Sequence, residues 1–91
     1  MSEEPTTIIQ SYISDLLSRS EIVASTVFDK VTVVHVKLPN GFVLTETSGC
    51  VDPANYSYEM GTEICLKKIE DQIWYLEGYL LQDKLKIGGI K

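Results

Sequence analysis

The stretch that most constrains the fold lies between Val31 and Thr47, because it predicts two strands joined by a tight turn. Residues 31–38, V-T-V-V-H-V-K-L, are rich in β-branched side chains, which favour a pleated strand. Asn40-Gly41 follows, and this pair is typical of a two-residue type I′ turn, whose two central residues need positive φ. We therefore expect a β-hairpin whose first strand is Val31–Leu38.

A two-residue turn at Asn40-Gly41 also predicts the register of this hairpin. The pairs expected on the core face are Leu38–Val43, Val36–Thr45 and Val34–Thr47. The pairs expected on the other face are Pro39–Phe42, Lys37–Leu44 and His35–Glu46. The second face also carries Val31 and Val33, so both faces are apolar. Two apolar faces in so small a chain predict packing on another copy, and hence a homo-oligomer.

Patterns on either side of the hairpin predict two helices and one more strand. An apolar stripe at helical spacing predicts a helix that starts near Pro5 and ends at residues 18–20; its members are Ile8, Ile9, Tyr12, Ile13, Leu16 and Leu17. The run Ile22–Phe28 predicts a first strand, followed by a turn at Asp29-Lys30. After a loop over residues 49–58, a second helix is expected from about Tyr58.

Gly78 interrupts the pattern of this second helix. Glycine costs about 1 kcal/mol inside a helix, so a bend or break is expected there, with Tyr79–Lys86 resuming as a short helix. The whole chain of 91 residues is expected to be one α+β domain, 1–91, with flexible tails at 1–5 and 87–91. Its predicted order is an N-terminal helix, a three-stranded antiparallel meander and a bent C-terminal helix.

Charge and composition exclude several functions. Thirteen acidic against eight basic residues give a net charge of −5, which argues against duplex nucleic acid as a partner. The apolar runs are shorter than the ~20 residues that span a bilayer, and the acidic start M-S-E-E-P-T-T does not resemble a signal peptide. We therefore expect a cytosolic protein without a membrane partner. Cys50 and Cys65 are expected to be free thiols.

Residues with reactive side chains are few. His35, the single histidine, could pair with Cys50 as a nucleophile, but a cross-strand contact with Glu46 is the favoured interpretation. No phosphate-loop, dinucleotide or metal motif is present, so neither catalysis nor a cofactor nor a metal is expected. The aromatic residues Trp74, Tyr75 and Tyr79 belong to a core or an interface, or stack on a base.

A specific combination of spaced residues runs through the second half of the chain. Its members are Asn40-Gly41-Phe42, Thr45, Ser48, Cys50, Asp52-Pro53, Asn55, Gly61-x-x-Ile64 and Trp74-x-Leu76-Glu77-Gly78-Tyr79-Leu80-Leu81. This combination resembles a family of small tailed-phage proteins of unknown function. In size and layout the chain is also similar, more distantly, to the Thoeris anti-defence sponges. Those phage proteins are oligomers that bind a cyclic NAD-derived immune signal without altering it chemically.

The resemblance implies a function in the host cytoplasm during infection: binding and sequestering a cyclic nucleotide or NAD-derived signal in a cleft between protomers. The residues it implies for ligand binding are Phe42, Thr45, Asn55, Tyr56, Trp74 and Tyr79, with phosphate met by Arg19, Lys67 or Lys68. The chain departs from the family at Thr62-Glu63, where Arg-Lys is usual, and at Glu70 and Gln72, which replace basic residues. Guanidinium groups are strong phosphate ligands, so their loss points to a different ligand or a different surface.

Two other hypotheses stay open. The first is a protein-binding inhibitor of a host factor, which would use an acidic helix face containing Glu63, Glu70 and Asp71. The second is a structural accessory phage protein with no ligand.

Overall fold

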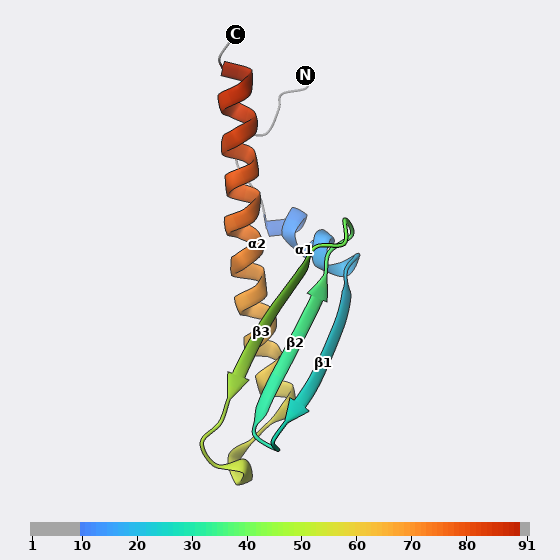
Figure 1. The fold of residues 1–91 in the computed structure, drawn as a ribbon, viewed down its shortest axis with the longest axis vertical. Helices are drawn as coiled ribbons and strands as arrows, with labels where there is room; N and C mark the ends of the chain where they lie inside the picture. The colour runs from blue at the N-terminus through green and yellow to red at the C-terminus, as the bar shows by residue number, and fades with distance from the viewer. Residues whose placement is uncertain (1–9, 90–91) are drawn as a thin grey trace.

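The computed structural model describes residues 10–89 and shows a three-stranded sheet with one long helix packed on one face (Figure 1). The elements in order are α1 (Gln10–Ser18), β1 (Glu21–Val27), β2 (Val31–Lys37), β3 (Val43–Gly49), the short 3-10 helix η1 (Pro53–Asn55) and α2 (Tyr58–Gly89). The predicted α+β class and its order of elements are confirmed. Ile8, Ile9 and the tails predicted at 1–5 and 90–91 lie outside the described residues.

The sheet is an antiparallel meander in the order β1-β2-β3, so β2 is central and the other two strands form its edges. Strands β1 and β2 lie within about one residue of the predicted ranges, because β-branched residues make up most of each. The turn between β1 and β2 lies one residue earlier than predicted. Phe28 and Asp29, rather than Asp29 and Lys30, have positive φ, at 55° and 59°.

The predicted register of the β2–β3 hairpin is wrong by one residue. The structure pairs Val36 with Leu44 and Val34 with Glu46. At the turn, the Leu38 N–H donates to the Phe42 carbonyl at 2.8 Å, which leaves a three-residue loop, Pro39-Asn40-Gly41. Proline has no N–H, so Pro39 cannot donate to the ladder next to a two-residue turn; its fixed φ suits the second position of the turn instead. Gly41 has the predicted positive φ, at 95°.

This shift inverts the two faces of β3. The prediction was right for β2, where Val34 and Val36 are buried, but Leu44 rather than Val43 or Thr45 is buried on β3. A one-residue slip moves every side chain of a strand to the opposite face. The predicted His35–Glu46 pair is therefore wrong. On the open face, away from α2, His35 Nδ1 lies 2.8 Å from Thr45 Oγ1, while Glu46 accepts a hydrogen bond from Gln72 of α2.

Helix α2 is continuous over 32 residues, so the predicted break at Gly78 is wrong, and the helix includes residues 87–89 of the predicted tail 87–91. Figure 1 shows the helix running through this region without a kink. A single glycine costs about 1 kcal/mol, which the hydrogen-bond ladder on either side outweighs. The core forms where the first half of α2 meets the sheet and α1; its members are Ile13, Leu16, Val34, Val36, Leu38, Leu44, Cys65, Ile69 and Ile73.

The two layers differ in length. Helix α2 extends for about 48 Å at 1.5 Å per residue, whereas each seven-residue strand spans about 24 Å. Its second half therefore projects past the sheet, as Figure 1 shows. The radius of gyration is 16.7 Å, compared with about 12 Å for a compact chain of this length. Within residues 10–89 no helix is long and apolar enough to cross a membrane.

Candidate functional site

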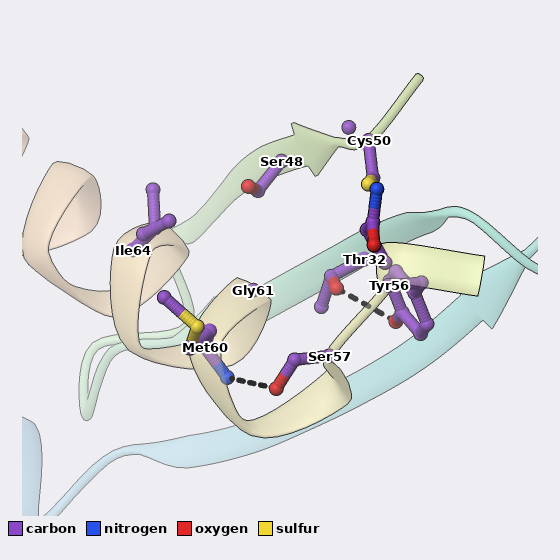
Figure 2. A pocket seen from close by; sticks show the side chains of 10 residues that line it. Thr32, Ser48, Cys50, Tyr56, Ser57, Met60, Gly61 and Ile64 are labelled. Atoms are coloured by element: carbon purple, nitrogen blue, oxygen red, sulfur yellow. Dashed lines mark hydrogen bonds between the residues drawn. The ribbon is translucent and has the colours of Figure 1, made fainter. Parts of the chain in front are cut away.

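A pocket of about 140 Å³ lies between the end of β3, the loop that carries η1 and the first turns of α2 (Figure 2). It is lined by Thr32, Ser48, Gly49, Cys50, Asn55, Tyr56, Ser57, Met60, Gly61 and Ile64. Figure 2 shows Ser48 and Cys50 on one side and Met60 and Ile64 of α2 on the other. None of the lining residues is charged, so the pocket offers hydroxyl, amide, thiol and apolar groups.

The loop that forms one wall of the pocket is held by local capping. Asp52 precedes η1, and its Oδ1 accepts a hydrogen bond from the Ala54 N–H at 3.0 Å. Pro53 then begins the 3-10 turn, where its missing N–H has no partner to lose. Ser57 caps α2, since its Oγ accepts from the Met60 N–H at 3.2 Å. These caps fix the direction in which α2 leaves the loop.

The floor of the pocket is a close contact between α2 and β2. A Cβ added at Gly61 would lie 2.0 Å from Thr32 Oγ1, so only glycine fits at this crossing. Thr32 is fully buried, and its Oγ1 lies 2.7 Å from the Tyr56 hydroxyl. The same hydroxyl lies 2.8 Å from Thr26 Oγ1 on β1. Tyr56 therefore ties the loop to two strands, and this role differs from the predicted stacking on a ligand.

The two cysteines are free, as predicted, and have different environments. Cys50 is half-buried on the pocket wall, and its thiol donates to the Asp52 carbonyl at 3.2 Å. Cys65 lies on the buried face of α2, against the sheet, and this burial raises the pKa of its thiol. The alternative Cys50–His35 pair does not form, because His35 lies on the opposite face of the sheet and contacts Thr45. No cluster able to hold a metal ion occurs in the described part of the chain.

The predicted ligand-binding residues do not come together within one chain. Asn55 and Tyr56 line the pocket, and Asn55 is exposed, so a ligand can reach its amide. Phe42 lies in the β2–β3 turn at the far end of the sheet, and Thr45 lies on the open face.

The remaining two predicted residues lie on α2, beyond the pocket. Trp74 packs against the core, and Tyr79 lies about 28 Å along the helix from Met60 at 1.5 Å per residue. A cleft between protomers that brings these residues together stays a prediction.

The cations predicted to meet phosphate also lie outside the pocket lining. Arg19, at the end of α1, pairs with Asp15 at 3.0 Å. Lys67 lies 3.4 Å from Glu70 and 3.8 Å from Asp71. Lys68 Nζ donates to the Thr47 carbonyl at 2.9 Å. Each of these side chains already has a partner in the fold.

Several lining residues were missed in the sequence. Ser57, Met60, Gly61 and Ile64 recur at i, i+3, i+4 and i+7, which places them on one side of a helix. This spacing, together with a turn-rich loop directly before it, is a signal that could have identified the pocket wall. The placement of Thr32 in the floor and of Ser48 in the opposite wall depends on the sheet register, which the sequence did not reveal.

The chain belongs to the phage protein (N4 Gp49/phage Sf6 gene 66) family, whose profile matches residues 5–85. This match confirms the predicted membership of a family of small phage proteins. It extends from the N-terminal region into the distal part of α2, and it does not support the further link to the Thoeris sponges. Searches of curated proteins and of solved structures gave no match.

Proposed function

We propose that this chain is a phage counter-defence protein that binds and sequesters a cyclic nucleotide or NAD-derived signal without turning it over. The observation that carries the proposal is the uncharged polar pocket beside Asn55, at the start of α2. An amide and hydroxyl groups at the edge of an apolar wall suit a base or a ribose, because both need hydrogen bonds and an apolar contact. Membership of a phage protein family supports a function inside an infected host cell.

The size of the pocket limits how much of the ligand it holds. Sites for whole small molecules measure roughly 300–1,000 Å³, whereas this pocket measures about 140 Å³. One base or ribose therefore enters, and the remainder of the ligand lies over the rim. The exposed side chains of Met60 and Ile64 lie at that rim and offer apolar surface. Because the lining carries no charge, we expect the phosphate groups of the ligand to lie outside it.

Calorimetric titration with cyclic ADP-ribose isomers and cyclic dinucleotides tests the proposal. We expect one member of the panel to bind and to be recovered unchanged from the denatured complex by mass spectrometry. Asn55→Ala should weaken binding by about ten-fold, because the polar group it meets is left unpaired. Gln82→Ala, on exposed α2 surface far from the pocket, is the matched control and should bind like the wild type. If the wild type binds no member of the panel, or if both variants lose the same amount of affinity, the proposal is refuted.

A second candidate is a protein-binding inhibitor of a host factor, and the exposed end of α2 favours it. Tyr75 and Tyr79 are 84% and 72% exposed, and Leu80 and Ile87 lie nearby. The acidic face first considered is less suited, because Glu70 and Asp71 are paired with Lys67. If the helix end binds a host protein, Leu80→Glu should reduce phage plating on a defended host, while Glu63→Lys and Asn55→Ala should not. Reduced plating with Asn55→Ala alone supports the pocket.

A structural accessory role with no ligand is the third hypothesis. It predicts no binding across the nucleotide panel and no effect of any of these three variants on plating. Phage particle yield in an undefended host would then be the quantity that changes when the gene is deleted.

A further inference from the structure

Strand β1 is the least covered element of the sheet. Six of its seven residues are exposed, and only Ala24 is partly buried against the core. Helix α2 packs mainly on β2 and β3, and within residues 10–89 no strand pairs with the free edge of β1. Figure 1 shows β1 at the outer side of the sheet, with no helix or strand of the described chain along its free edge. Ile22 and Val23 are 44% and 52% exposed on this strand.

The two edges of the sheet differ in how they are protected. On β3, the Lys68 ammonium of α2 covers the outward Thr47 carbonyl, and Glu46 is bonded to Gln72 of the same helix. On β1, the sequence E-I-V-A-S-T-V contains no proline or lysine, and its one charge, Glu21, is at the end. Natural sheets usually block an edge with such residues, because an open ladder pairs with other strands. The β1 edge is therefore the unprotected one.

The alternation of an antiparallel ladder shows which backbone groups of β1 are free. The Leu38 N–H bonds to Phe42, so the even-numbered residues of β2 bond to β3. Its odd-numbered residues then bond to β1, and through the β1–β2 register they meet Glu21, Val23, Ser25 and Val27. The N–H and C=O groups of Ile22, Ala24 and Thr26 consequently point outward, away from β2.

We propose that β1 pairs with β1 of a second copy, antiparallel and about a two-fold axis at Ala24, to form a continuous six-stranded sheet. In this register Ala24 faces Ala24 of the second copy, and Ile22 faces Thr26 of the second copy. All three outward-pointing residues then fall in hydrogen-bonded pairs, which gives about six new bonds. The strand is therefore complementary to itself, as a two-fold interface requires.

The charge pattern agrees with this register. Glu21, the one charged residue of β1, faces Val27 of the second copy, so like charges do not meet across the junction. On the open face, Val23 and Val27 of each copy extend the apolar surface of Val31 and Val33 across the junction. The pairing goes beyond the proposed function and is independent of it, because the pocket lies at the end of β3 and the start of α2.

Light scattering on the full chain, coupled to gel filtration, tests the pairing. We expect about 20 kDa, twice the 10.2 kDa of one chain, or a multiple of this value. Ala24→Pro should halve the particle mass, because the Ala24 N–H points outward and its loss breaks bonds only across the new junction. Leu80→Glu, on exposed α2 surface, should leave the mass unchanged. A wild-type mass near 10 kDa, or halving by Leu80→Glu instead, would overturn the proposal.

A cysteine cross-link provides a second measurement that does not depend on proline. In a Cys50→Ser background, Ala24→Cys should form a disulfide-linked dimer in air, since facing residues of a hydrogen-bonded pair lie about 5.5 Å apart at Cα. Ser25→Cys is the matched control. It is exposed on the same strand but faces Val23 of the second copy, so it should cross-link at least ten-fold more slowly. Equal rates, or no cross-link at position 24, would contradict the pairing.

Discussion

The two halves of α2 belong to one helix but have opposite environments. In residues 58–73, Gly61, Cys65, Ile69 and Ile73 lie against the sheet and are buried. In residues 74–89, side chains of similar apolar character remain exposed; they are Tyr75, Leu76, Tyr79, Leu80, Leu85 and Ile87. The difference arises because the strands end about 24 Å along a helix of about 48 Å. Burial in this protein is therefore set by the length of the sheet and not by the composition of the helix.

The sharpest test of this contrast is to shorten one side chain in each half of α2. Ile69→Ala should lower the free energy of unfolding by about 2–5 kcal/mol, because Ile69 is fully buried and a cavity is left. Leu80→Ala should lower it by less than about 1 kcal/mol, since Leu80 is 57% exposed. Urea unfolding followed by circular dichroism measures both. An equal loss in the two variants would show that the distal half is also buried in solution.

A smaller effect is expected at the crossing of α2 and β2. Gly61→Ala should lower the free energy of unfolding by about 1–3 kcal/mol, because the new Cβ overlaps Thr32 and the two elements must separate. The chemical shifts of Thr32 and Tyr56 should change with it. Retention of wild-type stability at this position would mean that the first half of α2 is not held against the sheet.

Tyr56 ties the loop before α2 to β1 and β2, so its hydroxyl provides the next test. Tyr56→Phe should lower the free energy of unfolding by about 1–2 kcal/mol, because Thr32 Oγ1 is left without its partner in a buried position. In a Thr32→Val background the same change should lower it by less, since the buried hydroxyl of Thr32 is gone. Additive costs in this cycle would argue that the hydroxyl does not bind Thr32.

The smallest change is expected at Gly78, in the exposed half. A Cβ at this position meets no atom within 4 Å, so Gly78→Ala should raise the free energy of unfolding by about 0.5–1 kcal/mol through helix propensity alone. Thermal unfolding at several protein concentrations measures the gain. A loss of stability instead would reveal that another chain or segment packs against Gly78.

The predicted elements were largely right because they depend on local chemistry. β-branched runs gave the first two strands, the Asn40-Gly41 turn gave the third, and the residues before Tyr58 gave the start of α2. Gly41 has the positive φ expected of it. Asn55 and Tyr56 of the predicted site also line the pocket, since a loop of turn residues beside a helix start is visible locally. These features involve residues close to one another in the chain.

The remaining features were decided by the tertiary structure. The observed register buries Leu44 with Val36 against α2 and agrees with the missing N–H of Pro39. Its shift moved Thr45 to the face opposite the pocket. Helix α2 continued through Gly78 because the helical ladder outweighs the cost of one glycine, which carried Tyr79 far from Asn55. Local propensities of about 1 kcal/mol identify an element, but the summed packing of the core and the relative lengths of helix and sheet determine which side chains meet.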